Sequence, residues 1–335
     1  MASILVTGSA GFIGFFVAKA LLTTGNTVVG IDNFNPYYAP QLKRARWEIL
    51  AHEKNFRAVE GDLADRKTVE RLFSKYAPET VCHLAAQAGV RYSLRNPHAY
   101  QESNLQGFVN IMEAARLQAV NRFVYASSSS VYGGNTKMPY SEDDPVNTPV
   151  SLYAATKRAN ELMAYTYTHL WDLQTIGLRF FTVYGPWGRP DMAYWSFLEA
   201  ILHDETIRVF NHGRNRRDFT YIDDVVQGVE AALFSPAMGR FEIINLGHHE
   251  PVELMDFIET LEELSGKKAM KDMVAAQPGD VVATYADIEK ARRLLGFSPT
   301  TSLKDGLQHF VKWYAEHPEL TSRVREFRQI SKTGI

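Results

Sequence analysis

Short apolar runs alternate with longer stretches of helical spacing along the first part of the chain. Residues 3–7, 27–32 and 80–84 are runs of this kind, and their length and apolar character are typical of strands buried on both faces. The stretches between them repeat apolar residues at intervals that favour helices. This alternation predicts an α/β fold built on a doubly wound, Rossmann-type parallel sheet.

The pattern changes near residue 181. Residues 181–190 are rich in glycine, proline and aromatic side chains, so we place a domain boundary there. We expect a first domain over 1–180 and a smaller mixed α/β domain over 181–335, with segments near 216–250 returning to the first domain. The later elements that we expect are helices at about 192–203, 222–234, 253–265, 286–294 and 302–316 and strands near 207–210 and 241–246.

Three glycines follow the first strand at a spacing that suits a phosphate-binding turn. Gly8 allows the tight turn, Gly11 lets the backbone approach a pyrophosphate, and Gly14 lets the following helix pack close to the sheet. A plain glycine turn is the alternative interpretation. However, the second strand ends in Asp32, at the spacing expected for a ligand of a ribose hydroxyl. Because a carboxylate there would repel a phosphate, the pattern predicts NAD rather than NADP and makes residues 1–180 the NAD-binding domain.

Two further strand ends should lie at the same edge of the sheet, where doubly wound folds bind their ligands. They carry residues 61–63 and 84–89, whose small side chains leave room for a cofactor. Asp62 has two interpretations. It is either part of the cofactor site or the N-cap of the next helix.

The candidate chemistry comes from Tyr153 and Lys157, which are four residues apart in a helical pattern and therefore share one face. A lysine beside a tyrosine stabilises the phenolate, and lowering the tyrosine pKa from about 10 to about 7 takes roughly 4 kcal/mol. Such a tyrosine can act as a base near neutral pH. Serines 127–130 follow the preceding strand. Serines in turns usually satisfy backbone groups only, but this loop should face the nicotinamide, so we expect hydroxyl, phenol and ammonium to converge.

The composition of the chain limits the classes of partner and the cellular compartment that we expect. The net charge of −2 gives no reason to expect nucleic acid or an anionic membrane. The single cysteine, Cys82, excludes an intramolecular disulfide and fits a reducing compartment. A strand pattern begins at once and no apolar run approaches about 18 residues, so we expect a cytoplasmic protein without signal peptide or membrane span.

The second part of the chain contains several arginines, whose guanidinium groups suit phosphate and carboxylate. They are Arg189, Arg208, Arg214, Arg216 and Arg217.

Four segments are similar to those of a known family. They are residues 85–93, 185–192, 217–224 and 277–281. With the glycine turn, the serine loop and Tyr153-x-x-x-Lys157, they make nearly the whole chain resemble the extended short-chain dehydrogenase/reductase family and, within it, the UDP-glucuronate 4-epimerases. One departure is Phe15-Phe16, where relatives usually carry a small residue and a histidine, and we expect it to alter helix packing.

The resemblance implies a tightly held NAD, a UDP-sugar substrate, no metal, and a homodimer joined by helices near 97–118 and 152–170. The catalytic residues that it implies are Ser128, Ser129, Tyr153 and Lys157. The cofactor-binding residues that it implies are Gly8, Gly11, Phe12, Ile13, Gly14, Asp32, Asn33, Lys43, Asp62, Leu63, Leu84, Ala85, Ala86, Gln87, Asn104, Ser127, Tyr153 and Lys157. The substrate-binding residues that it implies are Gln87, Arg91, Ser128, Ser129, Thr182, Arg189, Arg217 and Asp280.

The resemblance also implies one reaction among several related ones. Dehydratases carry an acidic pair in the loop matching residues 128–130, decarboxylating relatives usually keep a glutamate there, and galactose epimerases carry an asparagine at the position of Thr182. Arg189 suggests a carboxylated sugar. The implied activity is NAD-dependent interconversion of UDP-glucuronate and UDP-galacturonate through a 4-keto sugar, in support of polysaccharide biosynthesis. The alternatives are a UDP-glucuronate decarboxylase, another sugar-nucleotide epimerase or dehydratase, and an NAD-sensing interaction protein without catalysis.

Overall fold

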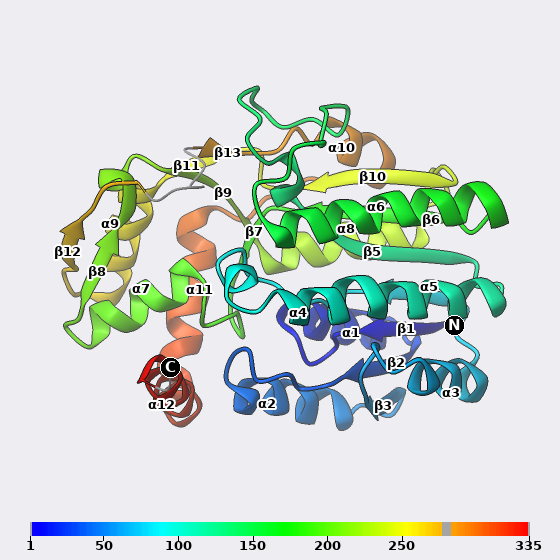
Figure 1. The fold of residues 1–335 in the computed structure, drawn as a ribbon. Coiled ribbons are helices and arrows are strands. Elements are labelled where there is room, and N and C mark those ends of the chain that lie inside the picture. Colours follow the sequence, from blue (N-terminus) through cyan, green and yellow to red (C-terminus); the bar gives the residue numbers. More distant parts are fainter. Residues whose placement is uncertain (1, 277–282, 334–335) are drawn as a thin grey trace.

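The computed structural model of the chain describes residues 2–276 and 283–333. Its central feature is a seven-stranded sheet in the order β10-β6-β5-β4-β1-β2-β3, in which each pair of neighbours is parallel (Figure 1). The strands are β1 (Ser3–Thr7), β2 (Thr27–Asp32), β3 (Phe56–Glu60), β4 (Thr80–His83), β5 (Arg122–Ser128), β6 (Thr175–Phe180) and β10 (Phe241–Leu246). The predicted doubly wound α/β fold is confirmed.

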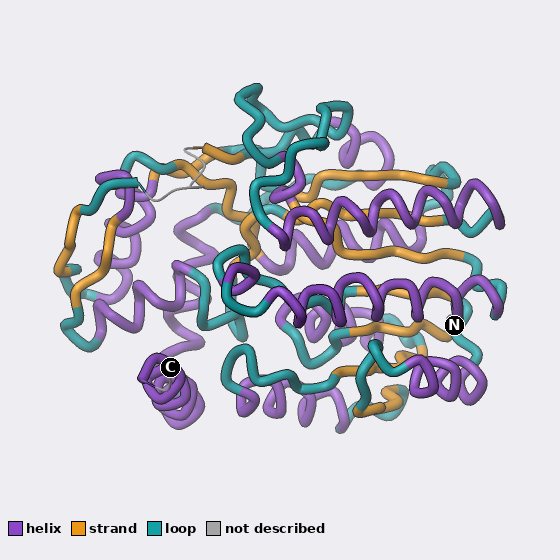
Figure 2. The backbone as a smooth tube through the Cα atoms, in the orientation of Figure 1, coloured by secondary structure: helices purple, strands orange, loops and turns teal. Residues whose placement is uncertain are grey.

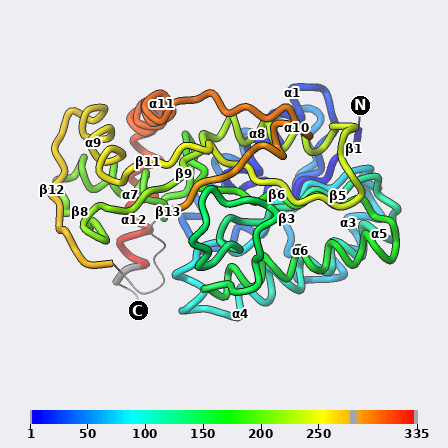
Figure 3. Tube along the Cα trace, turned by 90° about the horizontal axis from the view of Figure 1, so that it is seen from above, coloured from blue at the N-terminus to red at the C-terminus, as the bar shows by residue number. Residues whose placement is uncertain are grey.

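Helices cover both faces of this sheet (Figures 1 and 3). They are α1 (Phe12–Thr23), α2 (Pro40–Ala51), α3 (Arg66–Tyr76), α5 (Gly107–Leu117), α6 (Leu152–Trp171) and α8 (Ile222–Phe234). Successive residues of a strand point to opposite faces. Ile4 and Val6 accordingly join the core that contains α1, α2 and α8, whereas Leu5 joins the core that contains α3, α5 and α6. Burial on both faces explains why these strands are continuous apolar runs.

The long helix predicted near 97–118 has an irregular middle. It consists of α4 (Pro97–Tyr100), a π-helical turn η2 (Gln101–Gln106) and then α5. Wide turns of this type are frequently found at functional sites. Here the turn contains Asn104, whose side chain is buried.

Most of the remaining elements form a smaller lobe beside the sheet (Figure 2). Its strands are β7 (Thr182–Tyr184), β8 (Thr206–Val209), β9 (Arg216–Tyr221), β11 (Pro251–Glu253), β12 (Met270–Met273) and β13 (Ala283–Thr284), and its helices are α7 (Ala193–Leu202), α9 (Leu254–Ser265), α11 (Leu303–Glu316) and α12 (Pro318–Thr333). Helix α10 (Glu289–Leu295) instead packs against α8 and β10 of the large sheet (Figure 1). The strand expected near 241–246 is β10 and pairs with β6 in the large sheet. The division at residue 181 itself stays a prediction.

Two of the sequence expectations concern single side chains. Cys82 is fully buried in β4, as its strand pattern predicts. Phe15 is buried within α1, and its ring lies 5.1 Å from that of Phe16 and 5.9 Å from that of Trp187. Phe15 therefore packs against the glycine-rich segment that follows β7, and Phe16 packs against Phe12 and Phe15 within α1. In the described part of the chain, no helix combines the length and apolar character needed to cross a membrane.

Candidate active site

A cavity of about 260 Å³ lies at the carboxyl ends of the parallel strands. This is the edge at which doubly wound sheets bind ligands. The predicted site residues that line it are Gly8, Gly11, Phe12, Ile13, Gly14, Asp32, Asn33, Lys43, Asp62, Leu63, Leu84, Ala85, Ala86, Gln87, Ser127, Ser128, Tyr153, Lys157 and Arg189. The fold thus brings the glycine turn, the acid after β2 and the tyrosine–lysine pair to one place.

The glycine turn between β1 and α1 leaves no space for larger residues. Gly8 has a φ of +70°, and a Cβ added there would lie 2.8 Å from the backbone nitrogen of Ala85. A Cβ on Gly14 would lie 2.1 Å from the carbonyl oxygen of Gly8. No side chain caps the start of α1, and Phe12 and Ile13 of its first turn line the cavity. Free N–H groups at a helix N-terminus suit a pyrophosphate.

Asp32, at the end of β2, is buried and held in place. One carboxylate oxygen accepts a hydrogen bond from the backbone of Ala10 at 3.1 Å, and the other accepts one from Phe34 at 2.8 Å. The carboxylate therefore faces the cavity in a fixed orientation, which fits the ribose of a dinucleotide. The glycine turn and this acid together fit NAD.

The N-cap interpretation of Asp62 is wrong. Helix α3 begins at Arg66, and its N-cap is Asp65, whose side chain accepts a hydrogen bond from the backbone of Lys67. Asp62 instead lines the cavity and accepts a 2.9 Å hydrogen bond from the side chain of Asn33. Two aspartates lie three residues apart here, and the sequence does not indicate which of them starts the helix.

Tyr153 and Lys157 both reach the cavity from the first turns of α6, whose N-cap is Ser151. Burial raises the pKa of Tyr153, while a hydrogen bond with Ser128 and the charge of Arg189 lower it. Lys157 donates a 2.8 Å hydrogen bond to the carbonyl oxygen of Ala126, and burial lowers its pKa to about 8. The predicted effect of the lysine on the tyrosine stays a prediction.

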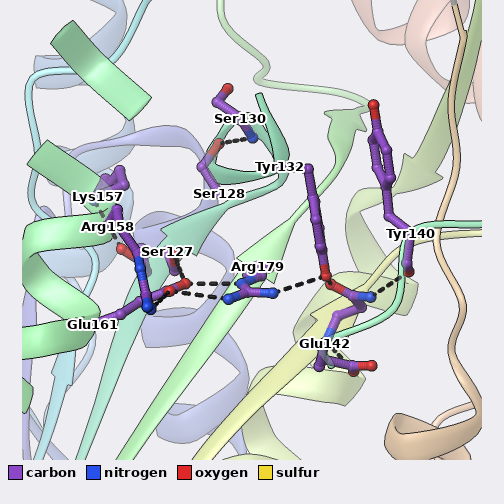
Figure 4. Close-up of polar contacts among 12 residues, drawn as sticks. Ser127, Ser128, Ser130, Tyr132, Tyr140, Glu142, Lys157, Arg158, Glu161 and Arg179 are labelled. Carbon is purple, nitrogen blue, oxygen red and sulfur yellow. Dashed lines mark hydrogen bonds and ion pairs between the residues drawn. The ribbon is translucent and has the colours of Figure 1, made fainter. Parts of the chain in front are cut away.

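The serines at the end of β5 and directly after it have different surroundings (Figure 4). Ser127 is buried and donates a 2.6 Å hydrogen bond to Glu161. Ser128 lines the cavity, and its hydroxyl also accepts a 3.2 Å hydrogen bond from the backbone of Ser130. Ser129 does not line the cavity. Among these serines, Ser128 is therefore the one whose hydroxyl lies beside the phenol of Tyr153.

A buried ion pair lies directly behind these groups (Figure 4). Glu161, one helical turn after Lys157, binds Arg179 of β6 through contacts of 2.8 and 3.0 Å, and both side chains are almost completely buried. Arg179 also donates a 3.0 Å hydrogen bond to Tyr132. Although burial opposes it, the pairing keeps the pKa of Glu161 below its ordinary value. This network was not predicted from the sequence, since its members are separated along the chain.

Asn104 supports the cavity wall from behind. Its side chain accepts a 2.8 Å hydrogen bond from the backbone nitrogen of Gln87 and donates a 3.0 Å hydrogen bond to the carbonyl oxygen of the same residue. It also donates to Thr156 on α6 at 3.1 Å. Asn104 thus fixes the cavity segment after β4 relative to the helix that carries Tyr153.

The predicted substrate-binding residues are more scattered. Arg189 lines the cavity and forms an ion pair with Asp191. Thr182, Arg91 and Arg217 do not line it, and Asp280 lies outside the described residues. Gly61 and Ala88 also line the cavity, as expected of the segments 61–63 and 84–89, whereas the cavity-lining residues that were not predicted are Ile31, Asn35, Tyr37, Tyr38, Ser103, Ala126, Phe180, Phe181, Val183 and Met192. The aromatic loop directly after Asp32 was a visible signal for several of them.

Comparisons with known proteins agree with this geometry. Residues 4–247 match the model of the NAD dependent epimerase/dehydratase family. UDP-glucuronate 4-epimerase 4 of Arabidopsis thaliana is 48% identical over 333 residues, which cover 94% of this chain and 76% of the relative.

Two solved structures have the same fold over nearly the whole chain. UDP-glucuronic acid 4-epimerase from Bacillus cereus, in complex with UDP-glucuronic acid and NAD, is 36% identical with a TM-score of 0.88, over 94% of this chain and 99% of that one. UDP-glucose 4-epimerase from Thermotoga maritima, with UDP-glucose, is 30% identical with a TM-score of 0.85, over the same shares. The chain belongs to the NAD-dependent epimerase/dehydratase family.

Proposed function

We propose that the protein is a UDP-glucuronate 4-epimerase, which interconverts UDP-glucuronate and UDP-galacturonate. The observation that carries the proposal is that Tyr153 and Ser128 line the same cavity as the glycine turn and Asp32. A base, a hydroxyl donor and a dinucleotide cradle are what inversion at a carbinol carbon requires. The uronate substrate is supported by the relatives, which include epimerases named for UDP-glucuronate.

NAD would be held by the start of α1 and by Asp32. The N–H groups after Gly11 would bind the pyrophosphate, and the carboxylate of Asp32 would accept hydrogen bonds from ribose hydroxyls. When bound, NAD supplies a hydride acceptor and donor for carbon 4 of the sugar. Lys157, which lines the cavity one turn after Tyr153, would add a positive charge near the ribose and the phenol.

Tyr153 acts as the base and then as the acid in this proposal. Its phenolate takes the proton of the carbon-4 hydroxyl. Its phenol returns a proton to the same oxygen after the 4-keto sugar has rotated and presented its other face. The Ser128 hydroxyl donates a hydrogen bond to the same substrate oxygen and stabilises the charge that develops there. Burial raises the pKa of Tyr153, whereas the hydrogen bond with Ser128 and the charge of Arg189 lower it. In this proposal the charge of Lys157 adds to that effect and makes the phenolate accessible.

The sugar and its nucleotide would be bound by residues around the cavity. We propose that Arg189 and Thr182 bind the carboxylate, that Arg217 and Asp280 bind the UDP group, and that the remaining contacts come from Gln87, Arg91 and Ser129. The residues 128–130 carry no acid, which disfavours a dehydratase. A decarboxylase is disfavoured for the same reason.

We further propose a homodimer joined through α5 and α6, working in the cytoplasm and feeding polysaccharide biosynthesis. Exposed apolar side chains on these helices support the interface. They are Val109, Leu117, Leu162, Tyr165, Leu170 and Trp171. The single buried Cys82 fits a reducing compartment. The two-domain division at residue 181 belongs to the same proposal, with the smaller lobe as the substrate domain.

Product analysis tests the proposal. Purified protein is incubated with UDP-glucuronate and the product is identified by NMR. UDP-galacturonate is the expected product, whereas UDP-xylose or a UDP-4-keto-pentose would indicate a decarboxylase. Conversion of UDP-glucose but not of UDP-glucuronate would indicate a neutral-sugar epimerase. Binding of NAD without conversion of any UDP-sugar would favour an NAD-sensing protein.

A further inference from the structure

The backbone that carries Arg189 is fixed by two side chains from elsewhere. The guanidinium of Arg46 donates hydrogen bonds to the carbonyl oxygens of Trp187 and Gly188, at 3.0 and 2.8 Å. The hydroxyl of Tyr194 accepts a 2.8 Å hydrogen bond from the backbone nitrogen of Arg189. The position of the Arg189 Cα is therefore set, and what the guanidinium offers to the cavity depends on its side-chain orientation.

Asp191 determines that orientation. Its carboxylate accepts hydrogen bonds from Nε of Arg189 at 3.1 Å and from Nη2 at 2.6 Å, which is a bidentate arrangement along one edge of the guanidinium. Tyr37 donates a further hydrogen bond to the same carboxylate at 3.0 Å. In the described part of the chain, Nη1 of Arg189 donates to no protein atom. The edge that contains Nη1 thus remains available.

Arg189 lies on the cavity side of its ion pair with Asp191, and both side chains are charged. Arg189 and Tyr37 line the cavity, whereas Asp191 does not. The exposed fractions of the Arg189 and Asp191 side chains are 23% and 28%. Burial lowers the pKa of Arg189, but the charge of Asp191 and its hydrogen bonds raise the pKa by more than burial lowers it, so the guanidinium stays charged. Burial also keeps the phenol of Tyr37 protonated, which makes it a donor to Asp191.

We propose that Asp191, fixed by Tyr37, is a positioning residue that turns the free edge of the Arg189 guanidinium into the cavity, and so sets the preference for a carboxylated sugar. The inference deepens the proposed function and rests on it. A guanidinium binds a carboxylate well only when its N–H groups are aligned with the two oxygens. Without Asp191, the arginine would keep its charge and lose this alignment.

Direct binding tests the inference apart from catalysis. Isothermal titration measures the affinity for UDP-glucuronate and for UDP-glucose in wild type, Asp191→Asn, Arg189→Ala and the double variant. In Asp191→Asn the affinity for UDP-glucuronate should fall about 10- to 100-fold, while that for UDP-glucose changes by less than about twofold. In the Arg189→Ala background, the Asp191 substitution should have no further effect, because the two residues act as a unit. Steady-state kinetics should show the loss in KM rather than in kcat.

Two further variants serve as controls for the role of Asp191. Tyr37→Phe keeps Asp191 and its two hydrogen bonds from Arg189 but removes the one from Tyr37, and should give a smaller loss in the same direction. Asp172→Asn interrupts another arginine–aspartate pair, with Arg240 on the surface, and should leave both affinities unchanged.

Several results would overturn the positioning role. They are equal losses for both sugars, additive losses in the double variant, and tighter binding of UDP-glucuronate by Asp191→Asn, which would make Asp191 a competitor of the substrate carboxylate. A wild type that does not bind UDP-glucuronate would also overturn it. A wild type that binds UDP-glucuronate without epimerising it would refute the proposed function and still leave the Asp191 test decisive.

Discussion

The hydroxyl of Ser127 lies 2.6 Å from a carboxylate oxygen of Glu161, and this hydrogen bond joins the end of β5 to α6. The same carboxylate pairs with Arg179 on the neighbouring strand β6. Ser128 follows on one side of this connection and Lys157 lies one turn away on the other. The Ser127–Glu161 hydrogen bond therefore fixes the distance between β5 and α6, the two elements that supply the proposed catalytic groups, and the ion pair with Arg179 holds Glu161 in place.

Glu161→Gln should destabilise the protein strongly. Removal of one partner of a buried ion pair leaves the charge of Arg179 buried without compensation, which costs about 3–5 kcal/mol. Urea unfolding measures the loss. The matched control is Glu70→Gln, which interrupts the exposed pair with Arg66 and should cost less than about 1 kcal/mol. Similar small losses in both variants would show that the buried pair is not a stabilising connection.

Gly14→Ala should abolish cofactor retention. The added Cβ would lie 2.1 Å from the carbonyl oxygen of Gly8, so the turn that precedes α1 must move. NAD released on denaturation of the purified protein measures the effect, and wild type should carry NAD without any being added. Gly134→Ala is the control, because the atom nearest to its Cβ would be 4.0 Å away. An NAD content in Gly14→Ala equal to that of wild type would contradict the assignment of this turn.

Tyr153→Phe should lose about 100- to 10,000-fold in turnover, as expected for removal of a general acid–base group. Its fold and NAD content should be unchanged, because only the hydroxyl is deleted. The assay follows conversion of UDP-glucuronate, with Tyr165→Phe as control, since Tyr165 is on the same helix but exposed. A Tyr153→Phe variant with more than about half of the wild-type rate would make this tyrosine structural.

The pH dependence of the unfolding free energy should reveal the lowered pKa of Lys157. Burial lowers its pKa from the ordinary 10.5 to about 8, and the charge of Glu161 opposes this shift. Between these values the unfolded chain binds more protons than the folded protein, so the contribution of Lys157 to stability rises with pH from about 8 to about 10.5. His83, whose pKa burial lowers, stays neutral in this range.

The measurement compares wild type with Lys157→Met by urea unfolding at several pH values. The difference in unfolding free energy, wild type minus variant, should increase as the pH rises from 8 to 10. A difference that stays constant, or one that decreases, would show that folding does not lower the pKa of Lys157.

The sequence predicted what depends on local pattern. Strands buried on both faces are apolar runs, and a glycine turn needs glycines at fixed spacing, so the sheet and the cradle of Gly8 and Gly14 could be recognised. Helix α12 was missed, although Leu320 and Val324 pack on the core. Its sequence is mostly polar, and only tertiary contacts determine where it lies.

The parts of the site that were missed depend on contacts between distant residues. The bond of Ser127 to Glu161 spans 34 positions, and that of Tyr37 to Asp191 spans 154. Such pairs cannot be read from spacing. Arg189 was singled out as a substrate ligand from its segment alone, and its dependence on Asp191 became visible only in the structure.

Oxidation and re-reduction at carbon 4 can be followed with UDP-glucuronate that carries deuterium at this carbon. Purified protein, without added cofactor, is incubated with this substrate in ordinary water, and the product is analysed by NMR and mass spectrometry. The expected product is UDP-galacturonate that retains the deuterium at carbon 4, since the hydride removed from this carbon returns to it while its configuration inverts. UDP-galacturonate without the label, a decarboxylated product such as UDP-xylose, or unchanged substrate would contradict the proposed mechanism.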